Sequence, residues 1–205
     1  MKIGIIKFST TNLFSIKSAC DYYSLDSVIS KCSKELSKVD ALILPGVGSF
    51  KSAMNFLKEN NLLDLINEFN LKKKKIMGIC LGFQILFSES EEFGKSKGLN
   101  LISGKVKSIP YKNKLNQKKI HTGWNKIILQ KKSKIINKNN SENFYYFTHS
   151  FYVQTDNSQA VLSNSLFNNF SFCSSIEYEN LFGCQFHPEK SGKEGIKIYY
   201  NFLKD

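Results

Sequence analysis

The chain of 205 residues fits a single domain, residues 1–205, since domains hold roughly 100 to 200 residues. Hydrophobic residues make up 41% and charged residues 22%, with only 3 Pro, which excludes a disordered or collagen-like chain. The net charge of +12 would suit a nucleic-acid partner, but all 29 basic residues are Lys, accompanied by 20 Asn. Because nucleic-acid recognition favours Arg, we interpret this charge as a chain-wide compositional bias.

The five cysteines indicate a reducing compartment. Their number is odd and none forms a Cys-x-x-Cys pair, so neither a disulfide framework nor a zinc-finger spacing is available. The first apolar run, residues 3–6, is too short for a signal peptide, and no later run approaches the roughly 18 apolar residues of a membrane span. The sequence therefore predicts a soluble cytoplasmic protein with no membrane or nucleic-acid partner.

The first half of the chain alternates predicted strands with predicted helices. Short β-branched or apolar runs predict strands at residues 2–6, 41–44 and 75–79. Apolar residues at helical spacing predict helices at residues 12–23, 50–69 (as one or two helices) and about 81–87. This alternation is typical of a parallel sheet covered on both faces.

The second half is rich in strands. Strand-like runs lie at residues 105–109, 126–129, 145–153, 160–163, 170–178 and 181–186, followed by a helix at 194–203. The Lys- and Asn-rich stretches 111–119 and 131–143 are predicted to be solvated loops. We expect an α/β fold: a mostly parallel sheet flanked by helices, extended by additional antiparallel strands.

The stretch GICLGFQ, residues 78–84, stands where a predicted strand meets a predicted helix. It has the Gly-x-nucleophile-x-Gly pattern of a nucleophile elbow, with Cys80 in the place of a serine. Gly78 and Gly82 would permit the tight turn, and the helix N-terminus would favour the thiolate. The backbone N–H of Leu81 would face a developing oxyanion. The alternative is a buried structural cysteine between two packing glycines.

A second signal is QFHPEKS, residues 185–191. In extended backbone, residues two apart face the same side, so His187 and Glu189 can share a face while Pro188 fixes the chain between them. Glu189 could hold the imidazole in one tautomer while His187 takes the thiol proton. A His-Pro-Glu stretch on its own is usually an ordinary loop and does not indicate a function. Together with the elbow, in the order Cys, His, Glu, it predicts an activated cysteine nucleophile.

A glycine-rich turn, PGVGSF at residues 45–50, follows the strand predicted at 41–44. The carboxyl edge of an open parallel sheet is where ligand sites lie, and such a turn can aim backbone N–H groups at an anion. An ordinary strand-to-helix turn is the alternative.

With these motifs the chain resembles the class I glutamine amidotransferases, and within them the glutaminase subunits of imidazole glycerol phosphate synthase. The resemblance covers nearly the whole chain and implies a flavodoxin-like architecture. The elbow and the His-Pro-Glu stretch are shared widely in the class, whereas three segments point more narrowly to those subunits. The stretches that recur in order are PGVGSF, GICLGFQ with SESEE at 88–92, HTGWN at 121–125, FTHSFYV at 147–153 and QFHPEKS.

The resemblance also implies a role for individual positions. It makes Cys80 the nucleophile on the glutamine amide, His187 the base and acid, and Glu189 the residue that orients His187. It places the oxyanion hole at the backbone of Val47, Gly48 and Leu81. Residues matching substrate-binding positions are Gln84, Glu92, Ser150 and Phe151. Positions matching the partner interface are Asn12 and Trp124, with Lys190 as a further candidate that could instead be merely solvated.

The chemistry that the resemblance implies uses no metal and no cofactor. A γ-glutamyl thioester forms with loss of ammonia and is hydrolysed to glutamate. The ammonia passes to a (β/α)₈ cyclase partner in a heterodimer, which makes imidazole glycerol phosphate and an aminoimidazole carboxamide ribotide in histidine biosynthesis. Ammonia protonates in water and loses nucleophilicity, so a shielded interface suits its transfer.

The resemblance weakens near the expected partner surface. Where the family reads Asp-Tyr-Gly and then Gly-Asn-Leu, residues 7–13 read KFSTTNL, and Ile120 and Thr122 replace a usual Pro and Met. Since β-branched Thr11 resists the positive φ that Gly permits, the loop is expected to have a different shape. This leaves open a paralogous glutaminase that feeds ammonia to a different synthase, such as one amidating a surface sugar.

Two alternatives come from other functional classes. One is a catalytically silent interaction protein, and the other is a Lys-rich nucleic-acid binder, whose binding would depend steeply on salt. We interpret His121 and His149 as polar structural or interface groups, because neither has metal-site spacing around it. The four cysteines other than Cys80 are predicted to be inert packing residues: Cys20, Cys32, Cys173 and Cys184.

Overall fold

The computed structural model describes residues 1–8, 13–111, 120–136 and 143–204, and the interface candidate Asn12 lies outside them. Five parallel strands form one side of its main sheet, in the order β2-β1-β3-β4-β14, with β2 at the edge. Their bounds are β1 Lys2–Ile6, β2 Asp26–Ser30, β3 Ala41–Leu44, β4 Lys75–Ile79 and β14 Leu181–Cys184. The carboxyl ends of β3 and β4 lead directly into the glycine-rich turn and the elbow, so the two motifs meet at one sheet edge.

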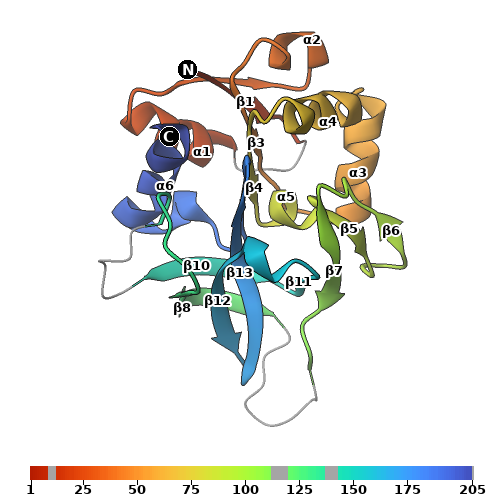
Figure 1. Cartoon of the computed structure of the whole chain (residues 1–205), viewed down its shortest axis with the longest axis vertical. Coiled ribbons are helices and arrows are strands. Elements are labelled where there is room, and N and C mark those ends of the chain that lie inside the picture. The colour runs from red at the N-terminus through yellow and green to blue at the C-terminus, as the bar shows by residue number, and fades with distance from the viewer. Residues whose placement is uncertain (9–12, 112–119, 137–142, 205) are drawn as a thin grey trace.

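Helices cover both faces of these strands, as Figure 1 shows. On one face lie α1 (Leu13–Tyr22) and α6 (Gly192–Lys204), and on the other α3 (Phe50–Glu59), α4 (Leu63–Leu71) and the short α5 (Leu81–Gln84). The four-residue α2 (Ser33–Leu36) follows β2. Alternating strand residues face two cores: Ile3 and Ile5 pack with α1 and α6, whereas Leu42 and Leu44 pack with α3 and α4.

Antiparallel strands extend the sheet beyond β14. The order continues β13-β11-β7-β5-β6, with β12 and β9 branching from β13, while β8 and β10 form a separate two-stranded sheet. All these neighbours are antiparallel except β5 and β7. Their bounds are β5 Phe87–Ser90, β6 Ser96–Lys97, β7 Ile102–Ser108, β8 His121–Lys126, β9 Ile128–Leu129, β10 Phe144–His149, β11 Phe151–Thr155, β12 Val161–Phe167 and β13 Phe170–Tyr178. Two single 3₁₀ turns are Ser158–Ala160 and Pro188–Lys190.

The predicted fold class is confirmed, whereas several element predictions are wrong. The run 145–153 forms parts of two strands in two sheets, because the extended strand is interrupted at Ser150. The helix predicted at 81–87 ends at Gln84, since Phe87 already belongs to β5. Strand β2 and helix α2 were not predicted, and the predicted loop 131–143 buries Ile135 and Ile136 in the core. Cys32 is exposed, so its interpretation as a packing residue is also wrong.

The elbow glycines are required by close packing. A Cβ on Gly82 would lie 1.7 Å from the backbone oxygen of Leu44 on β3, and one on Gly78 would lie 2.6 Å from the oxygen of Gly82. We therefore expect Gly82→Ala to lower the free energy of unfolding by about 3 kcal/mol or more, because backbone must move to admit the methyl group.

Urea unfolding monitored by circular dichroism checks this expectation. The matched control is Gly94→Ala, because Gly94 has a positive φ of 101° but open space around it, so its substitution costs only the conformational term of about 1–2 kcal/mol. If Gly82→Ala were no more destabilising than Gly94→Ala, close packing at the elbow would not be what requires glycine.

Candidate active site

Cys80 stands between β4 and α5, in a backbone conformation that favours glycine. Its φ is 52° and its ψ is −104°, and its N–H donates to Cys184 O at 2.8 Å, which joins the elbow to β14. A positive φ in a residue with a side chain costs of order 1–3 kcal/mol, and such strain concentrates at functional sites. The consequence is a thiol lifted off the carboxyl edge of the sheet, where the sequence places a nucleophile.

His187 and Glu189 form a buried pair beside Cys80. His187 Nδ1 lies 2.8 Å from Glu189 Oε1, and the two side chains are 3% and 4% exposed. The remaining carboxylate oxygen, Oε2, accepts a hydrogen bond from the buried Tyr199 hydroxyl at 3.3 Å. Because Glu189 is held from both sides, it fixes the imidazole with Nδ1 protonated and Nε2 turned away from the carboxylate.

The electrostatics of His187 favour its charged form. Burial lowers its pKa, but the neighbouring Cys80 and Glu189 raise it by more, to about 10. Its Nε2 is buried and makes no hydrogen bond within the described residues, and Cys80 raises its pKa through its charge. At neutral pH the site therefore holds an imidazolium that can stabilise a thiolate and later donate a proton.

The expected oxyanion donors surround the elbow. The Leu81 N–H donates a long hydrogen bond of 3.4 Å to Gly46 O, on the same glycine-rich turn that carries Val47 and Gly48. Gly48 has a φ of 115°, a backbone conformation that glycine adopts without strain. In this conformation the Leu81 N–H is occupied by protein, so an oxyanion would have to displace the Gly46 carbonyl to reach it.

A cavity of about 380 Å³ opens on Cys80 and holds the four predicted substrate-binding residues. Glu92 lies at its edge, where Oε2 accepts a 2.6 Å hydrogen bond from Phe50 N–H, the first residue of α3. Gln84 Nε2 donates to Phe151 O at 3.0 Å. The cavity is lined by Val47, Gly48, Cys80, Leu81, Gln84, Glu92, Phe93, Thr148, His149, Ser150 and Phe151. Its volume falls within the usual range for small-molecule sites, roughly 300–1,000 Å³.

Comparison with known proteins identifies the family. A family model described as "Glutamine amidotransferase class-I" matches residues 5–205. The chain belongs to this family. Two similar relatives are each named "Imidazole glycerol phosphate synthase subunit HisH". The one from Geobacillus sp. (strain WCH70) is 43% identical, covering 98% of this chain and 95% of the relative, and the one from Aquifex aeolicus is 38% identical, covering 100% and 97%.

Solved structures agree with the amidotransferase fold. The structure of PurLQS from Thermotoga maritima superposes with a TM-score of 0.76 at 18% identity, covering 98% of this chain and 97% of that one. A glutamine amidotransferase from the same organism gives a TM-score of 0.66 at 17% identity, covering 100% and 83%. At this identity the likeness shows the fold alone, and it confirms the α/β architecture predicted from the sequence.

Outside this amidotransferase site, two of the predicted interface residues lie together on the surface. Trp124 is 57% exposed and packs edge-on against Tyr146, with ring centroids 6.3 Å apart. The Lys190 ammonium lies 5.9 Å from the centroid of the same Tyr146 ring. The backbone oxygen of Tyr146 accepts from His187 N–H at 2.9 Å, so this surface directly adjoins His187.

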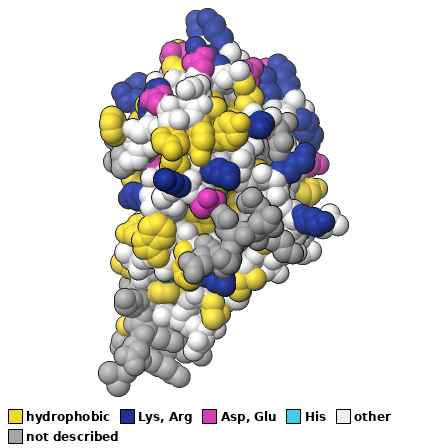
Figure 2. Space-filling model, turned by 90° about the vertical axis from the view of Figure 1, so that its left-hand side faces the viewer, with side chains coloured by type: hydrophobic (Ala, Val, Ile, Leu, Met, Phe, Trp, Pro, Cys, Tyr) yellow, Lys and Arg dark blue, Asp and Glu magenta, His cyan; other side chains and the backbone are white. Residues whose placement is uncertain are grey.

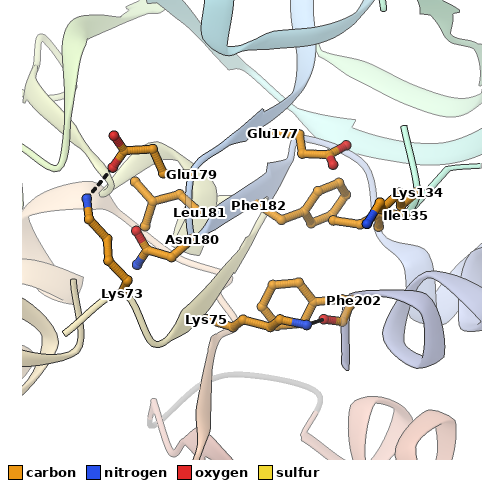
Figure 3. A pocket seen from close by; sticks show the side chains of 10 residues that line it. All are labelled: Lys73, Lys75, Lys134, Ile135, Glu177, Glu179, Asn180, Leu181, Phe182 and Phe202. Carbon is orange, nitrogen blue, oxygen red and sulfur yellow. Dashed lines mark hydrogen bonds and ion pairs between the residues drawn. The ribbon is translucent and has the colours of Figure 1, made fainter. Parts of the chain in front are cut away.

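A second cavity, larger than the one at Cys80, lies elsewhere. It measures about 600 Å³ and lies at the amino ends of β4 and β14; Phe182 and Phe202 line it, and the Lys73–Glu179 ion pair stands at its rim (Figure 3). None of the predicted site residues lines it. On the face in Figure 2, the Lys side chains of the described residues are scattered among apolar and acidic ones and do not form a continuous basic surface. Within the described residues no helix is long and apolar enough to cross a membrane.

Sequence reasoning missed several residues that the structure brings to the site. Four of them, Gln185, Tyr146, His149 and Tyr199, contact Cys80, His187, Phe151 and Glu189, respectively. Gln185 could have been found, since it precedes His187 by two residues and the run continues from a strand. The other three depend on which strands and helices pack together, which the local pattern does not contain.

Proposed function

We propose that this chain is the glutaminase subunit of imidazole glycerol phosphate synthase and supplies ammonia for a step of histidine biosynthesis. The observation that carries the proposal is the buried arrangement of Cys80, His187 and Glu189, in which Cys80 lines the cavity. It occurs in a chain that matches subunits of that name over 95% or more of both lengths.

The reaction begins at the Cys80 thiolate. Its sulfur attacks the side-chain carbonyl carbon of glutamine, and the carbonyl oxygen takes the negative charge. Backbone N–H groups of the Val47–Gly48 turn stabilise this charge, joined by the Leu81 N–H once the oxyanion has displaced the Gly46 carbonyl from it. His187, protonated as its pKa of about 10 indicates, donates its Nε2 proton to the departing nitrogen. The C–N bond breaks, ammonia leaves, and a γ-glutamyl thioester remains on Cys80.

Water then hydrolyses the thioester. His187, now neutral, takes a proton from the attacking water and keeps it as the C–S bond breaks and the thiolate leaves. The imidazolium and the thiolate are thereby restored, and the product is released as glutamate when its carboxylic acid loses a proton to solvent. Glu189 keeps Nδ1–H engaged throughout, so Nε2 always faces the reacting atoms. Gln84, Glu92 and the backbone of Ser150 and Phe151 hold the substrate in the cavity that they line.

The partner is a (β/α)₈ cyclase that docks beside Trp124 and Lys190. An exposed tryptophan beside a lysine that lies over a tyrosine ring suits a protein interface, because aromatic residues carry much of the binding energy of such surfaces. This surface adjoins His187, so ammonia formed at Cys80 travels a short way before the partner covers it. We expect the complex to work in the reducing cytoplasm, where the thiol persists.

The decisive experiment measures glutamate release with the purified chain alone and with the cyclase barrel of the same organism plus its nucleotide substrate. We expect the barrel and nucleotide together to raise the rate at least about tenfold, a barrier change of about 1.4 kcal/mol. An unchanged rate with a readily alkylated Cys80 would instead identify a working glutaminase that serves another synthase, as a paralogue would.

A surface variant tests the docking site in the same assay. Trp124→Ala is expected to raise the Kd of the complex with the cyclase barrel at least about tenfold, because truncating an aromatic side chain that anchors an interface costs more than about 1 kcal/mol of binding free energy. The matched control is Leu71→Ala, at another exposed apolar residue, on α4. Equal affinities for the two variants would place the partner elsewhere on the molecule.

A further inference from the structure

A chain of buried hydrogen bonds leads from the cavity to the sulfur of Cys80. Gln84 Nε2 donates to Gln185 Oε1 at 3.0 Å, and Gln185 Nε2 donates to Cys80 Sγ at 3.7 Å. A second hydrogen bond joins the sulfur to Thr148 O at 3.9 Å, to which the S–H can donate. Thr148 thus favours the thiol, and Gln185 favours the thiolate.

We propose that Gln185 is a positioning residue for glutamine cleavage: it directs an N–H at Cys80 Sγ, and a buried network that ends at His149 and His121 holds it in that orientation. The proposal rests on the proposed function in assigning Cys80 the attack on glutamine. Gln185 itself is fully buried and does not line the cavity, so it acts through Cys80 rather than on the substrate.

The backbone carbonyl of Phe151 sets the polarity of this network. A carbonyl oxygen only accepts hydrogen bonds, so the Gln84 group that contacts it must be Nε2. The second N–H of the same nitrogen then points to Gln185, which must present Oε1 and turn its own Nε2 toward the sulfur. Flipping Gln185 would place two donors face to face, and it would also put an oxygen against the sulfur, which is unfavourable when Cys80 is a thiolate.

Two histidines anchor the same carbonyl from the other side. His149 Nδ1 lies 2.8 Å from Phe151 O, so Nδ1 carries the proton, and its Nε2 accepts from His121 Nδ1 at 2.9 Å. His121 Nε2 in turn faces Asn125 Nδ2 at 3.1 Å, and that amide nitrogen also donates to Leu166 O. The carbonyls of Phe151 and Leu166, at the two ends of this chain of contacts, both require that His149 and His121 carry their proton on Nδ1. With these tautomers every hydrogen bond has one donor and one acceptor.

Burial keeps both histidines neutral, as these tautomers demand. Burial is the main cause that lowers the pKa of His149 to about 3, and the adjacent His121 and His187 lower it further while the Phe151 contact raises it. Burial lowers the pKa of His121 to about 4. The His121 ring is stacked between Phe147 and Phe167, with centroids 4.7 and 4.3 Å away. The pair is thus a rigid, uncharged support for Phe151 O.

The network also limits what Gln84 offers the substrate. Both N–H groups of its Nε2 are used, one by Phe151 O and one by Gln185. Only the oxygen Oε1 remains for a molecule in the cavity, so Gln84 accepts a hydrogen bond from glutamine and does not donate one.

The first test replaces Gln185 by the nearly isosteric but apolar Met. Losing the N–H disfavours the thiolate, so we expect the pH midpoint for iodoacetamide alkylation of Cys80 to rise by about one unit. With the partner present we expect kcat to fall about tenfold and the glutamine KM to change less than about twofold. Peptide mass spectrometry separates Cys80 from the exposed Cys32, an internal reference whose alkylation should not change.

The control for general destabilisation is Ser163→Ala. Ser163 Oγ is buried on β12 and bonds Ser174 Oγ at 2.8 Å and Ser175 Oγ at 2.5 Å, so its loss removes buried hydrogen bonds and leaves every side chain of the network in place, as well as the backbone contact of Ser174 O with Gln185 N–H. We expect this variant to lower Tm without moving the Cys80 midpoint. If Gln185→Met behaved in the same way, with Tm lowered but midpoint and kcat unchanged, Gln185 would be structural only and the proposal would be wrong.

A second pair of variants tests the support at Phe151. His149→Asn places an amide N–H where Nδ1 lies and can still donate to Phe151 O, whereas His149→Gln can still accept from His121 but loses that donor. We expect His149→Gln to raise the Cys80 midpoint and lower kcat, and His149→Asn to do so markedly less. Equal effects of the two variants would overturn the role of the carbonyl contact. Because alkylation needs neither glutamine nor a partner, these outcomes stay distinct from failure of the proposed function.

Discussion

Cys80→Ala is expected to abolish glutamate release, by at least about 10⁴-fold, because no other group in the cavity can form the thioester. The remaining cavity side chains are amide, carboxylate, hydroxyl, imidazole and apolar groups, none of which is the thiolate partner of His187. Partner binding should persist, since Trp124 lies on the surface and not in the cavity. Release of glutamate from glutamine and the Kd for the barrel, measured on the same preparation, check both halves.

The strained backbone at the elbow adds a second readout to this variant. Ala at position 80 keeps the cost of φ 52° with a Cβ, whereas Gly does not. Cys80→Gly should therefore be more stable than Cys80→Ala by roughly 1–3 kcal/mol in urea unfolding, although both are inactive. Residual activity near that of the native chain would show that the nucleophile is misassigned, and equal stability would show that the elbow stores no strain.

The central layer of the fold could be predicted from the sequence because each buried strand carries its signal locally. The strands at 2–6, 41–44 and 75–79 have the predicted bounds, since runs of apolar residues end at polar or glycine-containing turns. Strand β2, DSVIS, was missed because its half-buried, partly polar sequence at a sheet edge shows no strong pattern. The edge position, which only the pairing reveals, permits that composition.

The support of the site could not be predicted for a related reason. Residues 145–153 have the residue pattern of a single strand, yet the strand is interrupted at Ser150, and β10 and β11 lie in different sheets. That break turns His149 and the Phe151 carbonyl toward each other, and the β8–β10 register sets His121 directly opposite His149. Register and strand breaks follow from packing between distant segments, so a local pattern identifies Cys80 and His187 but not the network behind them.

Glu189→Gln is expected to reduce glutamate release by roughly 10²- to 10⁴-fold while leaving substrate binding nearly unchanged. The amide removes the negative charge that, together with Cys80, raises the pKa of His187 against burial. The imidazolium is then less favoured, and the amide can also present an N–H to Nδ1 and select the wrong tautomer. Steady-state kinetics with saturating partner should show the loss in kcat, with KM for glutamine within about twofold.

The pH dependence distinguishes this electrostatic role from simple disruption. His187 with a pKa of about 10 stays protonated up to that pH, so the native rate of ammonia release should decline only as pH rises toward 10. In Glu189→Gln that decline should begin at lower pH. Protonated His187 stabilises the fold fully below its pKa in the unfolded chain, about 6.5, and this stabilisation is lost as pH rises to about 10. The difference in free energy of unfolding between the native chain and Glu189→Gln should therefore shrink between these two pH values.

A partly buried carboxylate elsewhere in the fold provides the matched control for Glu189. Glu177 Oε2 accepts from Ser133 Oγ at 2.6 Å and lies at the cavity remote from Cys80. Glu177→Gln also exchanges a hydrogen-bonded carboxylate for an amide, but no histidine depends on it, so its pH profile should match that of the native chain. If Glu177→Gln and Glu189→Gln gave the same profile, the carboxylate would not set the charge of His187. A shift confined to Glu189→Gln would mean that this carboxylate keeps the imidazolium available to protonate the departing nitrogen.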